Sequence, residues 1–233
     1  RNKTTPRYKP GNGEGIVIRY DILICGIGGQ GAISLGTILK LAAIHEGLTV
    51  VGAERRGGAQ REGVVTSNVR YLGLEEGEPF DERKMAVSGL IPAAGADMMI
   101  SMEPLEALRH VRYLNENSTV IINDFPLIPV SVRIGDSSYP DREEIYSRIR
   151  QVTRHVHIHN IEEISKSRFN SLKQVNTLSL GIAYAVGNMP LSGESILATV
   201  KDQFPDFGKN KAAFSLGIEI GNSAAEGNAA PTP

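Results

Sequence analysis

The chain has 233 residues, 41% of them hydrophobic, which is enough to bury the core of one large α/β domain. Its 25 basic and 26 acidic side chains leave a formal charge of −1, so nothing indicates a nucleic-acid partner or a membrane surface. The single cysteine, Cys25, excludes an internal disulfide and an iron–sulfur cluster held by this chain alone; with no apolar run of about 20 residues, we expect a cytoplasmic protein without membrane insertion.

The chain opens with a polar segment rich in Gly, Pro and Lys, which predicts an extended N-terminal arm over residues 1–19. The apolar run Tyr20–Cys25 then predicts a buried strand. It breaks into the sequence GIGGQG, in which Gly26, Gly28 and Gly31 match the pattern GxGxxG. The apolar pattern of Ala32–Ala43 predicts a helix directly after this turn.

A glycine-rich turn between a strand and a helix leaves the first backbone N–H groups of the helix unpaired, and such groups attract anions. We therefore expect Gly28, Gly29, Gln30 and Gly31 to contact a phosphate or a similar anion. The alternative is that the glycines serve only to pack the helix closely on the strand.

A second strand is predicted at Leu48–Ala53, and Glu54 follows about where a Rossmann fold places the acidic residue that binds a ribose. The next loop reads Arg55, Arg56, Gly57, Gly58, Ala59, Gln60, Arg61. Because the planar arginine fork suits phosphate and carboxylate, this second loop and the glycine turn could bracket one anionic ligand. A solvated basic loop, or one that grips an acidic partner, explains the same residues.

Strands and helices alternate along the rest of the chain. We expect strands at Val64–Tyr71, Ala96–Met102, Thr119–Asn123 and His155–His159, and helices from Pro104, at Asp141–Val152, Ile161–Phe169, Val175–Val186, Ser195–Val200 and Lys211–Ile220. The pattern predicts one Rossmann-like α/β domain over residues 20–221, with a mostly parallel sheet and helices on both faces. The small and polar residues 222–233 predict a disordered tail.

Other patterns give weaker indications. His155, His157 and His159 face one side of a predicted strand and could hold a metal, although an exposed face or a subunit contact is the simpler interpretation. Lys173 belongs to a basic stretch that we interpret as solvated or partner-facing. The sequence has no serine nucleophile elbow and no carboxylate pair at acid–base spacing, so we expect neither catalytic residues nor a metal site.

Four separated blocks carry a family resemblance. They read GIGGQG, AERRGGAQREGVVTSNVR, ADMMISMEPLEALR and, from Asn176 to Gly181, NTLSLG. In this order they resemble the gamma subunit or domain of 2-oxoacid:ferredoxin oxidoreductases, above all the indolepyruvate ferredoxin oxidoreductases, and the likeness spans residues 20–221. It implies a Rossmann-like, non-catalytic domain in an enzyme whose partner subunits hold thiamine diphosphate and ferredoxin-like iron–sulfur clusters.

Enzymes of this family decarboxylate a 2-oxoacid oxidatively, pass electrons to ferredoxin or a related acceptor, and deliver the acyl group to coenzyme A. The resemblance implies an aryl substrate such as indolepyruvate or phenylglyoxylate, and a mobile domain that gates the active centre. The residues it implies as coenzyme A contacts are Gly26, Gly28, Gly29, Gln30 and Gly31 in the glycine turn and Arg55, Arg56, Gln60 and Arg61 in the second loop.

Two other hypotheses stay open at this point. A free-standing NAD(P)-binding Rossmann oxidoreductase would read the ribose with Glu54 or Arg55, although the crowded arginines and the lack of a proton-transfer residue disfavour it. A purely structural assembly subunit would leave the glycine turn empty.

Overall fold

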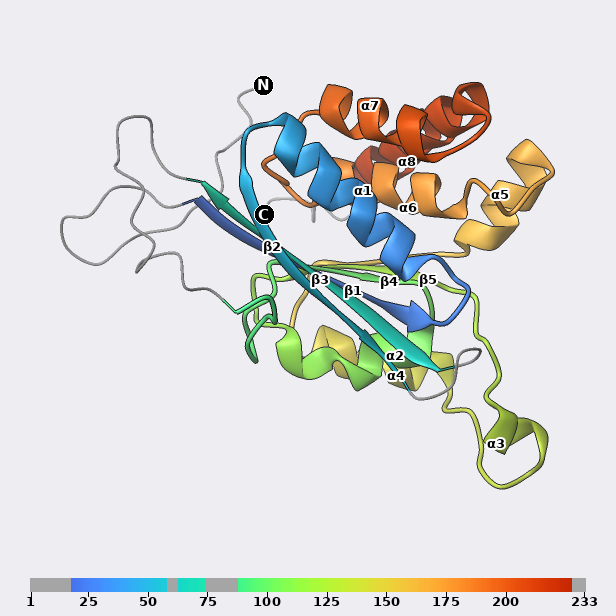
Figure 1. Cartoon of the computed structure of the whole chain (residues 1–233). Helices are drawn as coiled ribbons and strands as arrows, with labels where there is room; N and C mark the ends of the chain where they lie inside the picture. The colour runs from blue at the N-terminus through green and yellow to red at the C-terminus, as the bar shows by residue number, and fades with distance from the viewer. Residues whose placement is uncertain (1–17, 58–62, 74–87, 228–233) are drawn as a thin grey trace, which may run out of the picture.

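A six-stranded sheet organises the domain in the computed structural model, which describes residues 18–57, 63–73 and 88–227 (Figure 1). The strands are β1 Ile18–Ile27, β2 Thr49–Arg56, β3 Val64–Gly73, β4 Met98–Ser101, β5 Thr119–Asn123 and β6 Val156–His159, in the spatial order β2-β3-β1-β4-β5-β6. β1, β4, β5 and β6 pair in parallel, whereas β3 is antiparallel to both β1 and β2. The mostly parallel sheet is therefore confirmed, with β3 inserted between β1 and β2.

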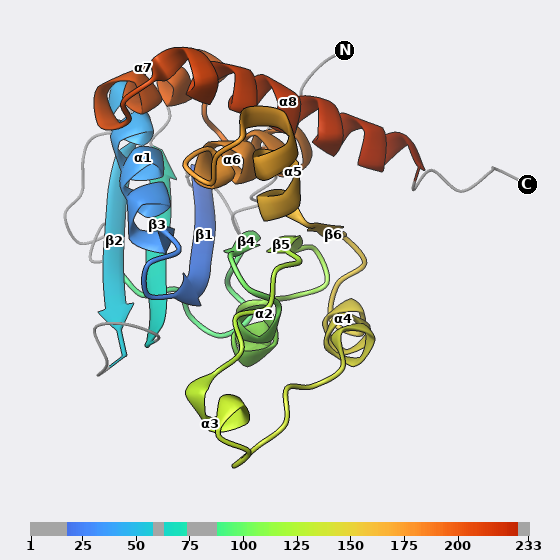
Figure 2. The same ribbon diagram turned by 90° about the vertical axis from the view of Figure 1, so that its right-hand side faces the viewer.

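Helices cover both faces of this sheet, as expected (Figures 1 and 2). They are α1 Ala32–His45, α2 Pro104–Arg109, the 3-10 helix η1 Val111–Tyr113, α3 Val130–Arg133, α4 Arg142–Arg150, α5 Ile161–Phe169, α6 Val175–Val186, α7 Gly193–Gln203 and α8 Phe207–Gly227. α1 and α5–α8 lie on one face, and α2 and α4 on the other, while α3 stands away from the sheet.

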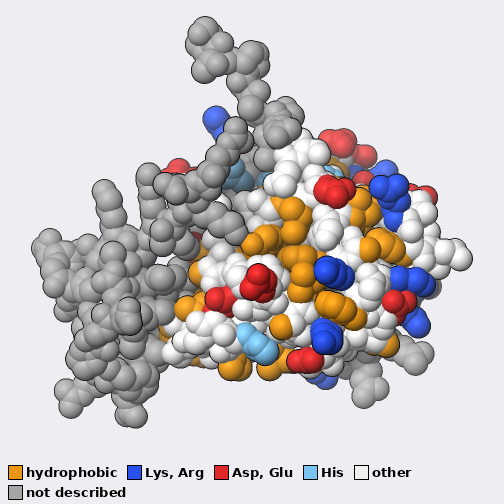
Figure 3. Space-filling model, turned by 90° about the horizontal axis from the view of Figure 1, so that it is seen from above, with side chains coloured by type: hydrophobic (Ala, Val, Ile, Leu, Met, Phe, Trp, Pro, Cys, Tyr) orange, Lys and Arg blue, Asp and Glu red, His pale blue; other side chains and the backbone are white. Residues whose placement is uncertain are grey.

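The alternation of side chains along β1 divides the core in two. Ile22 and Ile24 point into a cluster with α1, α6 and α8, whereas Leu23 and Cys25 point into a second cluster with α2 and α4. Because β1, β4 and β5 are covered on both faces, they read as continuous apolar runs. Seen from above, the outer surface of the α7–α8 layer mixes hydrophobic side chains with charges of both signs (Figure 3).

α6 and α8 cross at two glycines. A Cβ on Gly217 would stand 2.4 Å from the backbone oxygen of Leu178, and a Cβ on Gly181 would stand 2.2 Å from that of Phe214. The backbones therefore approach to distances that any side chain would prevent. Gly181, the last residue of the block NTLSLG, thus serves helix packing.

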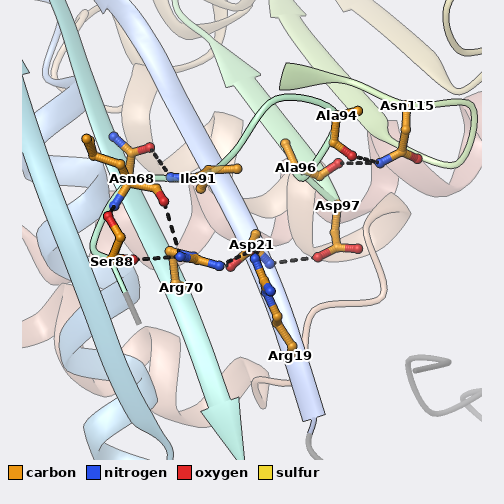
Figure 4. Close-up of polar contacts among 11 residues, drawn as sticks. Arg19, Asp21, Asn68, Arg70, Ser88, Ile91, Ala94, Ala96, Asp97 and Asn115 are labelled. Carbon is orange, nitrogen blue, oxygen red and sulfur yellow. Dashed lines mark hydrogen bonds and ion pairs between the residues drawn. The ribbon is translucent and has the colours of Figure 1, made fainter. Parts of the chain in front are cut away.

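A buried ion cluster ties residues 88–97 to the amino-terminal half of β1 (Figure 4). Arg70 and Asp21, 3% and 1% exposed, pair at 2.8 Å, and Arg70 also donates to the backbone oxygens of Ser88 and Leu90. Asp97 accepts the backbone N–H of Asp21 at 2.7 Å. Since Asp21 and Arg70 each have several partners, their buried charges are compensated.

The boundaries expected at the two ends need correction. β1 begins at Ile18, so Ile18 and Arg19 belong to the sheet and not to the arm, and Arg19 pairs with Asp21 at 2.7 Å. α8 runs to Gly227, so the disordered tail expected from residue 222 does not begin there, because extending a formed helix through alanines is inexpensive. Residues 1–17 and 228–233 lie outside the described part of the chain.

Candidate functional site

The glycine turn lies at the topological switch point of the sheet. β1 leads into α1 on one face, while its parallel neighbour β4 leads into α2 on the other. In open α/β sheets the crevice between two such strands, outside their carboxyl ends, is where ligands bind.

Two residues of the turn adopt the left-handed backbone that favours glycine. Gly29 has φ +99°, and a Cβ added to it would meet no described residue within 4 Å. Gly31 has φ +86°, and its Cβ would stand 2.1 Å from Nδ2 of Asn176, which donates to the Gly31 oxygen at 3.3 Å. Gly29 is therefore open toward solvent, whereas Gly31 is needed for close contact with α6.

The amino end of α1 is left open by this turn. Its N-cap is Gly31, no side chain of the described residues caps it, and its first turn holds no acidic residue. The Gln30 N–H donates to the Ile27 oxygen at 3.1 Å, and the Leu35 N–H donates to the Gly31 oxygen at 2.9 Å. The amides between Gln30 and Leu35 and the positive end of the helix dipole can therefore receive an anion.

The protein itself occupies part of the turn. Gly28 N–H donates to the oxygen of Gly63 at 2.9 Å, so this amide does not point outward as expected. Gln30 accepts the N–H of Ile27 through Oε1 and donates to the oxygen of Met102 through Nε2, both at 2.9 Å. Its side chain thus bridges the crevice between β1 and β4.

A cavity of about 250 Å³, the glycine-turn cavity, opens beside the turn. Its lining residues are Gly29, Gln30, Gly31, Met102, Asn123, Glu162, Leu172, Lys173, Val175 and Asn176. Burial raises the pKa of Glu162, and nearby Lys166 lowers it. Lys173, predicted to be solvated or partner-facing, is exposed and also contributes a positive charge beside the open end of α1. Both Lys173 and Asn176 reach the cavity through the packing of α6 against α1.

The arginines of the second loop line a different cavity, of about 280 Å³. Its lining residues are Leu23, Arg55, Arg56, Gly57, Val64, Thr66, Asn68, His110, Arg112 and Tyr113. The two cavities share no residue and open on opposite faces of the sheet, since Met102 belongs to the core under α1 and Leu23 to the core over α2. The two loops therefore line separate cavities in the described residues, and their binding of one shared ligand stays a prediction; Gln60 and Arg61 lie outside these residues.

Comparison with known proteins gives this geometry a family. The family model described as pyruvate ferredoxin/flavodoxin oxidoreductase matches residues 21–220. This chain belongs to that family. The expected resemblance is thereby confirmed, and the protein is a subunit of a 2-oxoacid ferredoxin oxidoreductase.

Two similar relatives in this family are indolepyruvate oxidoreductase subunits IorB. The one from Archaeoglobus fulgidus is 38% identical over 204 residues, covering 86% of this chain and 94% of that protein. The one from Methanothermobacter thermautotrophicus is 33% identical over 188 residues, covering 81% of this chain and 89% of that protein.

Two solved structures share the fold of this chain at lower sequence identity. The gamma subunit of a keto/oxoacid ferredoxin oxidoreductase from Geobacter sulfurreducens matches with a TM-score of 0.59 and 20% identity, over 88% of this chain and 99% of that one. The 2-oxoglutarate:ferredoxin oxidoreductase from Magnetococcus marinus matches with a TM-score of 0.62 and 16% identity, over 88% of this chain and 31% of that one.

In this chain Glu54 does not lie where a dinucleotide-binding Rossmann fold places its ribose-binding acidic residue. β3 separates its strand from β1, so Glu54 lies two strands away, roughly 9–10 Å at ordinary strand spacing. Its carboxylate pairs with Lys40 at 3.2 Å and with Arg56 at 3.5 Å. The geometry thus gives no support to the NAD(P) hypothesis.

The candidate metal ligands and the cysteine thiol are not arranged for metal binding or nucleophilic chemistry in the described part of the chain. Within that part, no three His, Cys, Asp or Glu side chains group so that they could hold a metal ion. Burial raises the pKa of the Cys25 thiol to about 12, which keeps it protonated and unreactive. No helix among the described residues has the length and apolar character required to span a bilayer.

Proposed function

We propose that this chain is the coenzyme A-contacting, gating subunit of a thiamine diphosphate-dependent oxidoreductase that converts an aryl 2-oxoacid, such as indolepyruvate or phenylglyoxylate, to its acyl-CoA. Ferredoxin or a related acceptor takes the electrons. The two IorB relatives, at 38% and 33% identity, support the aryl substrate because both are named for indolepyruvate.

The open amino end of α1 carries the proposal. Gly29, Gly31 and Lys173 line the cavity there, and no side chain of the described residues caps the helix. Coenzyme A bears a pyrophosphate and a phosphate monoester, the groups that helix amino ends and lysine bind. The Magnetococcus marinus enzyme, which shares this fold, was solved with coenzyme A and succinyl-CoA bound.

The reactive cofactors belong, on this proposal, to partner subunits. An iron–sulfur cluster needs several thiolates, whereas this chain has one cysteine, which is buried with a raised pKa. Thiamine diphosphate supplies the carbanion chemistry where it binds. This chain binds and orients coenzyme A, and its closure over the active centre excludes water.

Two matched glycine variants of the assembled enzyme test the coenzyme A contact. Gly29 and Gly47 have φ of +99° and +71°, and a Cβ on either would meet nothing within 4 Å. Valine therefore imposes a similar backbone cost at both, but only Gly29→Val narrows the glycine-turn cavity. We expect Gly29→Val to raise the KM for coenzyme A about 10-fold, equivalent to about 1.4 kcal/mol, without changing the KM for the 2-oxoacid.

The Gly47→Val enzyme should keep the parent KM for coenzyme A, because Gly47 lies beyond the other end of α1. Equal KM values in the two variants would contradict the contact. If Gly29→Val blocks assembly while the enzyme that does form uses coenzyme A normally, the purely structural alternative is correct.

A further inference from the structure

The second cavity has the chemistry of an anion site of its own. We call it the basic cup and define it by Arg55, Thr66, His110, Arg112 and Tyr113, which line about 280 Å³ between the carboxyl end of β2, β3 and η1. Alternation along β2 places Arg55 in register with Thr66 on the cup face. Arg56 also lines the cavity, but its guanidinium pairs with Glu54 at 3.5 Å.

The charges of Arg55 and Arg112 in the basic cup are not neutralised by the described residues, whereas Nδ1 of His110 lies 3.8 Å from Oε2 of Glu106. The described residues that line the cup include no Asp or Glu. Arg112 lies 4.9 Å from the centre of the Tyr113 ring and donates to the Tyr113 hydroxyl at 2.9 Å, which fixes the guanidinium without compensating its charge. Arg55 has no carboxylate partner in the part of the chain that the structure describes. Arg109, by contrast, is paired with Glu106 at 2.5 Å.

His110 adds a donor that depends on protonation. Its Nδ1 lies 2.8 Å from the backbone oxygen of Glu106, and because a carbonyl can only accept, the neutral ring carries its proton on Nδ1. Nε2 is then an acceptor, and no described residue bonds it. Burial lowers the pKa of His110, and Arg112, Arg109 and Arg55 lower it further. The hydrogen bond to the backbone oxygen of Glu106 raises it. An anion in the cup would oppose the effect of the arginines.

We propose that the basic cup binds a phosphate monoester, at a site separate from the glycine-turn cavity. Two guanidinium groups match the two negative charges of such a group, and the Thr66 hydroxyl and a protonated His110 can donate to its remaining oxygens. The monoester has two candidate sources. One is the 3′-phosphate of coenzyme A, which rests on the proposed function; the other is a free phosphorylated compound, which does not.

Binding to the full chain, measured by isothermal titration with adenosine 3′-monophosphate and with inorganic phosphate, tests the site. Arg55→Gln should weaken both ligands at least 10-fold. Arg154→Gln removes the same charge from an exposed arginine at the amino end of β6 and should leave both affinities unchanged. Equal weakening by the two variants, or no binding to the parent chain, overturns the proposal.

The protonation of His110 gives the site a second signature. Sulfate keeps its two charges between pH 6 and pH 8, so it isolates the response of the protein. The parent chain should bind sulfate more tightly as the pH falls, and His110→Asn should remove that dependence. The same pH dependence in both proteins would overturn the role of His110 in binding. The charged groups around His110 are Arg55, Arg109, Arg112 and Glu106.

Kinetics of the assembled enzyme distinguish the two sources. If the 3′-phosphate of coenzyme A lies in the basic cup, Arg55→Gln raises the KM for coenzyme A but not for dephospho-coenzyme A. If a free phosphorylated compound is the ligand, both KM values stay the same while the titrations still lose binding. Neither result depends on Gly29→Val, so a failure of the proposed function remains distinguishable from a failure of the cup.

Discussion

Gln30 shows that a residue in a predicted ligand turn can also hold the turn together. Its amide joins Ile27 and Met102 across the crevice between β1 and β4, with both bonds at 2.9 Å. The sequence places Gln30 in the turn, but its role depends on Met102, which only the folded sheet brings near. Whether Gln30 also touches a ligand remains a prediction.

Gln30→Glu tests this bridge at constant size. The carboxylate can still accept from Ile27, but it cannot donate to Met102 and adds a negative charge beside an anion cavity. We expect the free energy of unfolding to fall by about 0.5–1.5 kcal/mol, the usual net contribution of one hydrogen bond, because the Met102 oxygen keeps a second donor in Asn123 at 3.3 Å. Urea denaturation measures it.

The control for Gln30→Glu is Gln151→Glu, which makes the same change at the exposed C-cap of α4. Surface substitutions of this kind cost within about 0.5 kcal/mol. A loss for Gln30→Glu no larger than that of the control would show that the bridge contributes nothing.

Glu106 predicts a pH dependence of stability. It is 0% exposed, and Oε2 has no hydrogen-bond partner among the described residues. Burial raises its pKa, and Arg109 offsets part of that rise. The folded state therefore holds the proton more tightly than the unfolded state, whose glutamate pKa is about 4.3. The stability that Glu106 contributes is fully present below the unfolded pKa and is lost as the pH rises through the folded pKa.

Glu106→Gln should remove this loss. We expect the stability of the parent relative to Glu106→Gln to decrease as the pH rises from 4 to 7, measured by urea denaturation at several pH values. Glu116→Gln, at an exposed position, should give a flat difference. A parent that gains stability relative to Glu106→Gln over this range would contradict the sign of the pKa shift.

At the level of elements, the sequence predicts most of what local patterns determine. The expected bounds of Thr119–Asn123, Ile161–Phe169 and Val175–Val186 match β5, α5 and α6, since apolar patterning marks all three and Asn160 caps α5. α3 was missed because four residues carry no periodicity. The insertion of β3 between β1 and β2 was also missed, because strand order depends on pairing between distant segments.

The crossing of α6 and α8 predicts the effect of a single methyl group. In Gly217→Ala the new Cβ would stand 2.4 Å from the backbone oxygen of Leu178, which cannot move as a side chain can. Alanine has a better helix propensity than glycine, by about 1 kcal/mol. Overpacking should outweigh this gain, so we expect the free energy of unfolding to fall by about 1–3 kcal/mol, measured by thermal and urea denaturation.

Gly193→Ala is the matched control for Gly217→Ala. Its Cβ would lie 3.6 Å from the Tyr184 ring, an ordinary contact, at the first residue of α7. This variant should be neutral or slightly stabilised. Similar stabilities for the two alanine variants would refute the tight crossing.

For the whole molecule, the alternation of elements predicted the fold class and the four ordered blocks predicted the family. The division of the two candidate loops between two cavities was not predictable. Arg55 and Arg56 both line the second cavity, but only Arg56 pairs with Glu54. Lys173 and Asn176 reach the glycine turn only because α6 packs beside α1.

The central claim is that the open end of α1 receives a phosphate group of coenzyme A inside the assembled enzyme. The measurement that tests it most directly is a cryo-electron microscopy structure of the complete complex with coenzyme A bound. We predict phosphate oxygens within hydrogen-bond distance of the Gly29 and Gly31 backbone amides and of Lys173. Coenzyme A held wholly by partner subunits, with a partner side chain covering the amino end of α1, would contradict the account.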